Sequence, residues 1–459
     1  MHIFKDKVFV KKLLRLMLPV LLQELITTLI ASLSGLLIGA SGADQITVLG
    51  VGYALNIFLV YRYAILAIAV AGGLFIAQYY GRGDLYDVKR VYHTLLRFAV
   101  FISLLFFMLS LLISKQLIGL FTPDADVIEV GAQFLRILGF SFLFFDLSYI
   151  NTYMLKNLHL ANLATISSLA ALIIDVLLTC LFLFVFKLGA NSAAWAIVAT
   201  RVVEFIFSAI FLHYKSSVHF DFKLFFNPDI ENFVIVLRHM IPILISRTAY
   251  AVGTLVFSAI VGHMGNKDLS TATSILNYFV PYLHCVSSAC GVAAGILIGR
   301  ELGANRFKLA RKHSRDVVKI SIFTGIVNII ILALCLPIAL AIFSKGAVTT
   351  DAARIYLLIT FSVCATQLIQ QAVNTIFMQG FFIPGGCSVW YFIVQIVPQW
   401  CITIPLAFTG SHLIWPAIVI VVLTYAEETI RAVMNIAKFS VKDWLHNVIK
   451  KDPLIEEEK

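Results

Sequence analysis

The residue with the most distinctive chemistry is Asp175, which lies in the apolar segment LIIDVLLTC. Thr179 follows four residues later, so a helix would place the two side chains on one face. A carboxylate in such a segment can exchange a proton, or it can coordinate Na⁺ together with hydroxyl and carbonyl oxygens. The alternative is a structural hydrogen bond between helices. We therefore treat Asp175 as the leading candidate for a cation-coupling residue.

Other charged residues within apolar segments have simpler interpretations. Arg201 and Glu204 stand about one turn apart, which indicates a local ion pair. Asp146 is expected to contact a neighbouring hydroxyl or Arg62, with a role in a solute cleft as the alternative. Structural contacts are also expected for a charged group near the end of the last apolar segment, Glu427, Glu428 and Arg431.

The sequence lacks the motifs of enzymatic and metal chemistry. It has no HExxH, no GxSxG and no GxxxxGK[ST], and the GRGD stretch at 81–84 is interpreted as a turn. The seven Cys residues form no CxxC pair. We expect neither an enzyme nor a catalytic residue, a metal site or a cofactor.

Apolar blocks long enough to cross a bilayer run through the whole chain. Hydrophobic residues make up 60% of its 459 residues, charged residues 13%, and the mean hydropathy is +0.93. A spanning helix needs about 20 apolar residues. We therefore predict an all-α integral membrane protein of about twelve transmembrane helices. The blocks fall at roughly 13–40, 47–78, 91–115, 128–155, 160–187, 190–214, 234–262, 270–300, 314–344, 350–380, 387–410 and 413–438.

The net charge of +10 is explained by topology. Lys and Arg gather before the first block and after the second, sixth, eighth and last, whereas the alternate loops carry few of them. Lys156 and His159, which close the fourth block, fit the same side. The positive-inside rule then places both termini in the cytoplasm of a multi-pass protein of the cell membrane, in contact with lipid and without a nucleic-acid partner.

An internal duplication divides the chain. An ordered series of residues recurs at an offset of 221 to 224 positions, and LNIF at 55–58 reappears as LNYF at 276–279. We predict two pseudo-symmetric six-helix bundles: an amino-terminal lobe at 1–214, a cytoplasmic linker at 215–233, a carboxy-terminal lobe at 234–440 and a cytoplasmic tail at 441–459. Because six is even, both lobes should have the same orientation in the membrane. The series begins with Pro19, Gly39 and Gly42, which recur as Pro242, Gly262 and Gly265.

Several segments resemble the multidrug and toxic compound extrusion (MATE) family. LPVLLQELITTLIASLSGLLIGASG, followed by GGLFIAQYYGRGD, resembles the family's first two helices, and IPILISRTAYAVGTLVFSAIVGHMG with AAGILIGRELGAN resembles the start of its second half. FLRILG and IVATRVVE resemble the fourth and sixth helices. The resemblance implies two lobes around a V-shaped cleft and export of amphipathic organic cations or related compounds against inward flow of Na⁺ or H⁺.

The resemblance also implies an amino-terminal cation site. Its members here would be Asp175, Thr179, Ser34 in the first helix and Thr200 in the sixth. Many family members have an Asp where this chain has Ser34, and one bacterial branch has a Glu where it has Arg247. The coupling chemistry therefore cannot simply be transferred from the family.

Arg247 suggests an unusual solute preference. Glu24 and Arg247 are repeat mates, and a lone guanidinium in a membrane helix needs a counter-charge, supplied by Glu24 or by an acidic solute. The sequence thus predicts better handling of anionic or zwitterionic solutes than in a typical relative. The alternative is that Arg247 bonds helix-end carbonyls or a nearby acid. The predicted substrate cleft comprises Glu24, Asn56, Arg247, Asn277 and Tyr278.

We therefore expect an antiporter, acting as a monomer, that exports a small organic solute. A lipid-linked precursor flippase of the same superfamily is the alternative within transport, and it would need a wide basic cleft. A membrane-embedded enzyme is the alternative of another class.

Overall fold

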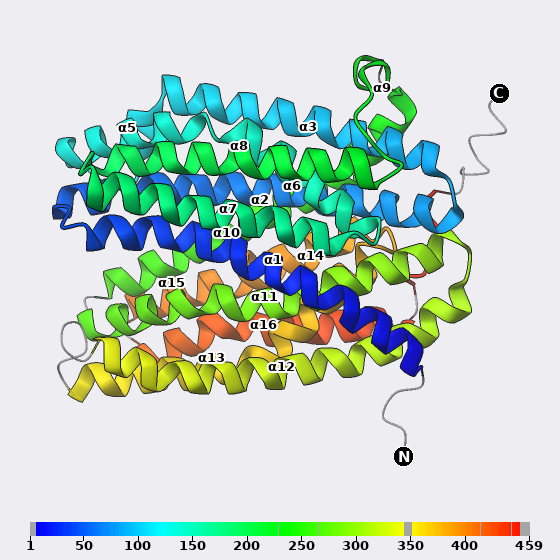
Figure 1. The fold of residues 1–459 in the computed structure, drawn as a ribbon. Helices are drawn as coiled ribbons and strands as arrows, with labels where there is room; N and C mark the ends of the chain where they lie inside the picture. The colour runs from blue at the N-terminus through cyan, green and yellow to red at the C-terminus, as the bar shows by residue number, and fades with distance from the viewer. Residues whose placement is uncertain are drawn as a thin grey trace. The chain divides into compact units, whose positions relative to one another are not determined.

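The computed structural model describes residues 6–227, 229–264, 266–343, 351–413, 415–441 and 443–449. All regular structure in these ranges is helical (Figure 1). The first half contains α1 (Lys7–Ala40), α2 (Gln45–Arg82), α3 (Leu85–Leu112), α4 (Ser114–Gly119), α5 (Ala125–Gly139), α6 (Phe142–Asn157), α7 (Ala161–Cys180), the π-helical segment η1 (Leu181–Val185), α8 (Ala190–Lys215) and α9 (Phe222–Phe226). The second half contains α10 (Ile230–His263), α11 (Lys267–Gly303), α12 (Phe307–Phe343), α13 (Asp351–Phe377), η2 (Met378–Phe382), α14 (Ser388–Ile396), η3 (Val397–Thr403), α15 (Ile404–His412) and α16 (Ala417–Val441).

The helices account for the predicted membrane crossings. Ten described spans are long and apolar enough to cross a membrane, and α5 with α6 forms an eleventh that is bent by 49°. The remaining long helix, α16, is apolar over most of its length but carries three charged residues close together, Glu427, Glu428 and Arg431, and is not among these spans. The prediction of an all-α membrane protein with about twelve long helices is confirmed.

Polar side chains at the loops fix where the helices begin. The carboxylate of Asp44 accepts a hydrogen bond from Thr47 N at the start of α2, and Asp84 accepts one from Asp87 N at the start of α3. These bonds satisfy amide groups that have no partner inside the helix. Between α2 and α3, Gly83 has φ 86°, a left-handed conformation that glycine adopts without steric cost.

The chain forms two compact units. The amino-terminal unit comprises residues 18–240, and the carboxy-terminal unit comprises the described residues from 6 to 17 and from 241 onward. Corresponding helix pairs pack inside each unit: α2 with α3 and α11 with α12, α6 with α8 and α13 with α16. Pro19 and Pro242 are each the second residue after a unit boundary.

The boundaries of these units differ from those of the predicted lobes. The start of α1, predicted in the amino-terminal lobe, packs with carboxy-terminal residues because the Phe9 ring stacks on the His313 ring, with 3.9 Å between the ring centroids. The predicted linker and the start of α10 pack with α3: Arg97 bonds the carbonyl oxygens of α9, and Phe233 stacks on Phe98 at 4.6 Å. Figure 1 shows α9 as a short helix beside α3. Three residues after the end of α16, Trp444 is only 1% exposed and stacks on Phe439.

Candidate functional site

The buried face of α7 carries the main candidate. Its buried residues recur every three or four positions, through Ala164, Ser168, Ala171, Asp175 and Thr179. This spacing gives one stripe, and the small side chains in it allow the neighbouring helix to approach closely. The stripe packs against α8. Asp175 and its hydroxyl neighbour therefore lie inside the helix bundle of the amino-terminal unit.

Only one of the two carboxylate oxygens of Asp175 accepts a hydrogen bond from a described residue. It is completely buried, and Thr200 of α8 donates a hydrogen bond from Oγ1 to Asp175 Oδ1 at 3.3 Å. Within the described part of the chain, Asp175 Oδ2 and Thr179 Oγ1 have no hydrogen-bond partner. A buried carboxylate oxygen without a donor is costly, so a proton or a cation is its natural ligand.

Helix α1 borders the same region. Ile30 packs against Ala171, one turn before Asp175, and Thr165 Oγ1 donates a hydrogen bond to the Pro19 carbonyl at 2.7 Å. The structure thus brings Asp175, Thr179 and Thr200 to the interface of α7 and α8, with α1 alongside. Ser34 belongs to α1, but its side chain lies outside the described residues.

The second charged group of this unit is a closed ion pair. Arg201 Nη1 donates to Glu204 Oε2 at 2.7 Å, and Ser168 Oγ donates to Glu204 Oε1 at 2.9 Å. The Arg201 guanidinium also lies over the Phe145 ring, 4.9 Å from its centroid. The predicted local ion pair is confirmed. Arg201 acts electrostatically on Asp175 as well, but it makes its ion pair with Glu204.

Lys156 has a partner that the sequence analysis does not name. Its side chain is only 2% exposed, and its Nζ lies 3.5 Å from Glu24 Oε1. The pairing joins α6 to α1, which the pattern of each separate segment does not indicate. Glu24, predicted in the substrate cleft as a counter-charge for Arg247, therefore has a cationic partner inside its own unit.

Asp146 in α6 is a second buried carboxylate. Neither of its oxygens makes a hydrogen bond to a described residue, and it is completely buried. The Tyr61 hydroxyl lies close to it and donates a hydrogen bond to the Phe142 carbonyl at 2.9 Å. The neighbouring group is thus a hydroxyl, one of the two partners expected.

Glu427, Glu428 and Arg431 form a structural network in the carboxy-terminal unit. Arg431 Nη1 lies 3.3 Å from Glu427 Oε1 and 2.9 Å from Glu428 Oε1. Asn374 of α13 donates to Glu428 Oε2 at 2.7 Å and accepts from Asn435 at 3.0 Å. The prediction of structural contacts for this group is confirmed, since the network ties α16 to α13.

Arg247 is a buried cation on α10. Its side chain is 8% exposed, and its guanidinium lies over the Tyr391 ring, 5.8 Å from the centroid. It makes no ion pair and donates no hydrogen bond to any residue that the structure describes. Its Nε is buried and unpaired. A bond to helix-end carbonyls or a nearby acid, the alternative interpretation of Arg247, is not present among the residues that the structure describes.

The remaining predicted cleft residues are divided between the two units. Asn56 of α2 is partly exposed and Asn277 of α11 is exposed, whereas the Tyr278 side chain lies outside the described residues. Asn56 belongs to the amino-terminal unit and Asn277 to the carboxy-terminal unit.

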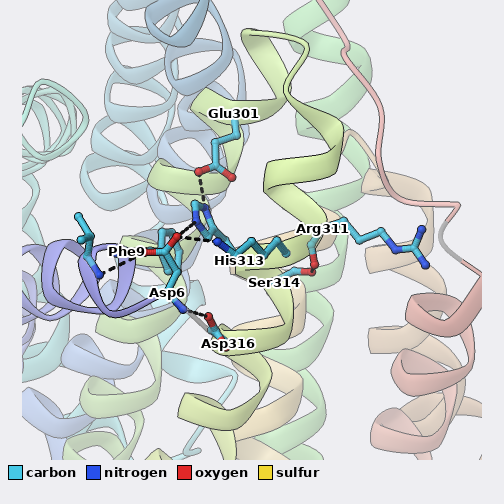
Figure 2. Close-up of polar contacts among 9 residues, drawn as sticks. Asp6, Phe9, Glu301, Arg311, His313, Ser314 and Asp316 are labelled. Carbon is cyan, nitrogen blue, oxygen red and sulfur yellow. Dashed lines mark hydrogen bonds and ion pairs between the residues drawn. The ribbon is translucent and has the colours of Figure 1, made fainter. Parts of the chain in front are cut away.

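A polar cluster at the start of α1 is absent from the sequence predictions. Figure 2 shows the His313 imidazole between two carboxylates, with Nδ1 2.6 Å from Glu301 Oε1 and Nε2 3.4 Å from Asp6 Oδ2. Lys312 donates to Asp6 Oδ2 at 2.9 Å, and the Asp6 amide donates to Asp316 Oδ2 at 3.1 Å. The hydrogen bond from Lys312 is the main cause that holds the pKa of Asp6 below its usual range. The only signal in the sequence is the basic stretch after the eighth block, which topology alone could explain.

Comparisons with known proteins agree with this architecture. The MatE family model matches residues 19–181 and 242–380, more than half of the chain, and the two matches begin at the repeat-mate prolines. The probable multidrug resistance protein YoeA of Bacillus subtilis is 23% identical over 366 residues, which cover 77% of each protein.

Solved structures show the same fold. A multidrug resistance MATE family transporter in an outward-facing conformation superposes with a TM-score of 0.85 at 15% identity, covering 94% of this chain and 95% of that one. A MOP superfamily transporter from Pyrococcus furiosus gives a TM-score of 0.84 at 15% identity, with the same coverage. With the family model matched in both halves and the long apolar helices in place, this chain belongs to the MatE family of membrane transporters.

Proposed function

We propose that this protein is a secondary active antiporter that exports small organic compounds in exchange for inward flow of H⁺ or Na⁺. The observation that carries the proposal is Asp175, a completely buried carboxylate with one oxygen bonded by Thr200 and the other unpaired among the described residues. The similarity to a probable multidrug resistance protein supports organic solutes as the cargo.

The surroundings of Asp175 explain how it could couple transport. Arg201, the nearby cation, makes its ion pair with Glu204 and so leaves Asp175 without a cation of its own. A buried carboxylate in this state is stabilised by binding H⁺ or Na⁺. Thr179 supplies a hydroxyl oxygen one turn away on the same face. Loading and release of the ion would change the charge of the α7–α8 interface, which gives the two occupancy states different preferred conformations.

The other parts of the proposal follow from the sequence pattern. We assign the protein to the cell membrane with both termini cytoplasmic, because Lys and Arg concentrate on one set of loops. We also propose that one chain is the working unit, surrounded by lipid and with a small molecule as its partner.

The test compares two buried carboxylates of the amino-terminal unit. Purified wild type, Asp175→Asn and Asp146→Asn are reconstituted in liposomes, and efflux of cationic, neutral and anionic dyes is measured under imposed H⁺ or Na⁺ gradients. Asp175→Asn keeps size and hydrogen-bonding capacity but removes the charge. We expect it to abolish gradient-driven efflux while solute binding persists, and Asp146→Asn to retain coupling.

The outcomes separate the alternatives. If Asp175→Asn shows gradient-driven efflux at the wild-type rate at every pH and Na⁺ concentration, the Asp175 carboxylate is structural and the assignment is overturned. Loss in the Asp146 variant alone would move the coupling site to α6. Movement of lipid-linked anions without any gradient-driven dye efflux would favour the flippase.

A further inference from the structure

Three arginines are buried among the described residues, and they differ in their partners. Arg201 is paired with Glu204, and Arg431 is paired with Glu427 and Glu428. Arg247 has no carboxylate partner and no acceptor for its N–H groups in the described part of the chain. A guanidinium stays protonated at any relevant pH, so Arg247 cannot relieve its burial by losing the proton.

The surroundings of Arg247 do not supply the missing anion. Tyr391 contributes a ring at 5.8 Å, whose face attracts a cation but accepts no N–H fork. Glu428 and Arg431, like Arg247, act electrostatically on His284, so these groups share one region of the carboxy-terminal unit. Both glutamates of this region are already bound by Arg431. The charge that remains without a counter-ion is the one on Arg247.

The position of the guanidinium nitrogens shows where a ligand could bind. Nε is buried and has no hydrogen-bond partner among the described residues. Neither terminal nitrogen makes a hydrogen bond to a described residue, so the outer edge of the guanidinium has no acceptor from that part of the chain, on a residue that is 8% exposed. A planar fork in this setting matches the two oxygens of a carboxylate or two of a phosphate.

We propose that Arg247, backed by the Tyr391 ring, is the anion subsite of the carboxy-terminal unit and receives the carboxylate or phosphate group of an anionic or zwitterionic solute. This inference rests on the proposed export of organic solutes and names their charge class. The same chemistry is present in an anionic lipid headgroup, so the experiment includes an arm for each source.

The experiment measures binding and transport separately. Protein in nanodiscs of zwitterionic phosphatidylcholine is titrated with fluorescein, an anionic dye, and with ethidium, a cationic dye, and anisotropy reports binding. The variants are Arg247→Gln, Arg247→Lys and the matched control Arg238→Gln, which removes the same charge from an exposed position on the same helix. We expect Arg247→Gln to weaken fluorescein binding about 10- to 100-fold, the range for one charge-assisted hydrogen-bonded contact. Ethidium binding should be unchanged.

The lysine variant and the lipid arm distinguish the origins of an effect. Arg247→Lys retains the charge without the planar fork and should give an intermediate affinity for fluorescein. The titration is then repeated with phosphatidylglycerol, an anionic lipid, in the nanodisc. If this lipid suppresses fluorescein binding in wild type and in Arg238→Gln but has no further effect in Arg247→Gln, the occupant of the subsite is a lipid headgroup. Unchanged fluorescein affinity in Arg247→Gln would overturn the proposal, and an accompanying loss of thermal stability would assign the guanidinium a structural role.

Failure of this inference differs from failure of the proposed function. If liposomes show gradient-driven dye efflux whose charge preference is the same in wild type and Arg247→Gln, the antiporter stands and the anion subsite falls. If wild-type liposomes export no dye under any gradient, the antiporter itself falls, whatever the binding result.

Discussion

A close contact between two glycines allows a sharp test of the amino-terminal unit. A Cβ placed on Gly50 of α2 would lie 2.9 Å from Gly131 N and 2.9 Å from Val127 O, both backbone atoms of α5. The reverse also holds, since a Cβ on Gly131 would lie 2.8 Å from Gly50 O. Backbone atoms cannot rotate away, so Gly50→Ala must push the two helices apart.

The matched control lies two residues further along the same helix. Gly52 is exposed, and a Cβ there would meet nothing within 4 Å. Replacing a mid-helix glycine by alanine stabilises by about 0.5–1 kcal/mol through the backbone alone. Both variants gain this amount, so it cancels in their comparison. What remains is the overpacking at Gly50, which costs about 1–3 kcal/mol.

We therefore expect Gly50→Ala to be about 1–3 kcal/mol less stable than Gly52→Ala. The measurement is unfolding of purified protein in mixed micelles, titrated with SDS and followed by far-ultraviolet circular dichroism. Gly52→Ala should equal or exceed wild type. Equal stability of the two alanine variants would refute the inferred backbone contact between α2 and α5.

Two further predictions concern the carboxy-terminal unit. Arg431→Met should destabilise by about 3–5 kcal/mol in the same titration, because it leaves the buried carboxylate of Glu427 and the half-buried one of Glu428 without a counter-charge. A loss below about 1 kcal/mol would show that the network is dispensable. Asp6→Asn should speed amide hydrogen exchange at the start of α1 at pH 7, since it removes the carboxylate that Lys312 binds. That bond lowers the pKa of Asp6, so the stabilisation that its carboxylate provides is present above about pH 4 and is lost as the pH falls through the lowered pKa. A difference in exchange rate between wild type and variant that persists after Asp6 is fully protonated would contradict this account.

The sequence could predict the features that repeat locally. Length and apolarity of the blocks are properties of each segment, so the long helices could be placed from the residues alone. The spacing of Arg201 and Glu204 was enough to predict their ion pair, because both belong to one helix. The bend between α5 and α6, where Phe140 and Ser141 interrupt one apolar block, left no clear mark in hydropathy.

Contacts between distant segments were the part that the sequence could not predict. The concentration of basic residues in the loops favours a cytoplasmic position for Lys156, but it does not indicate the ion pair with Glu24, which is 132 residues away along the chain (156 − 24). The cluster of Asp6, Glu301 and His313 joins the beginning of α1 to α11 and α12 in the same way. No period or motif encodes which helices become neighbours, so only the folded chain shows these partners.

The two halves of the duplicated chain differ in the sign of the buried charge that has no ion-pair partner among the described residues. In the amino-terminal unit Lys156 and Arg201 engage Glu24 and Glu204, which leaves Asp175 and Asp146 as buried carboxylates without an ion pair inside the described bundle. In the carboxy-terminal unit Arg431 engages Glu427 and Glu428, and the buried arginine without a carboxylate partner among the described residues is Arg247. The unpaired carboxylate of Asp175 suits a coupling cation, and the unpaired guanidinium of Arg247 suits an anionic group. The two proposed ligands therefore bind different residues. Since Asp175 and Arg247 belong to different units and share no side-chain partner among the described residues, the loss of coupling in one variant and the loss of anion binding in the other should be separable. Such independence would allow the proposed antiporter to be driven by a cation gradient while Arg247 binds an anionic solute.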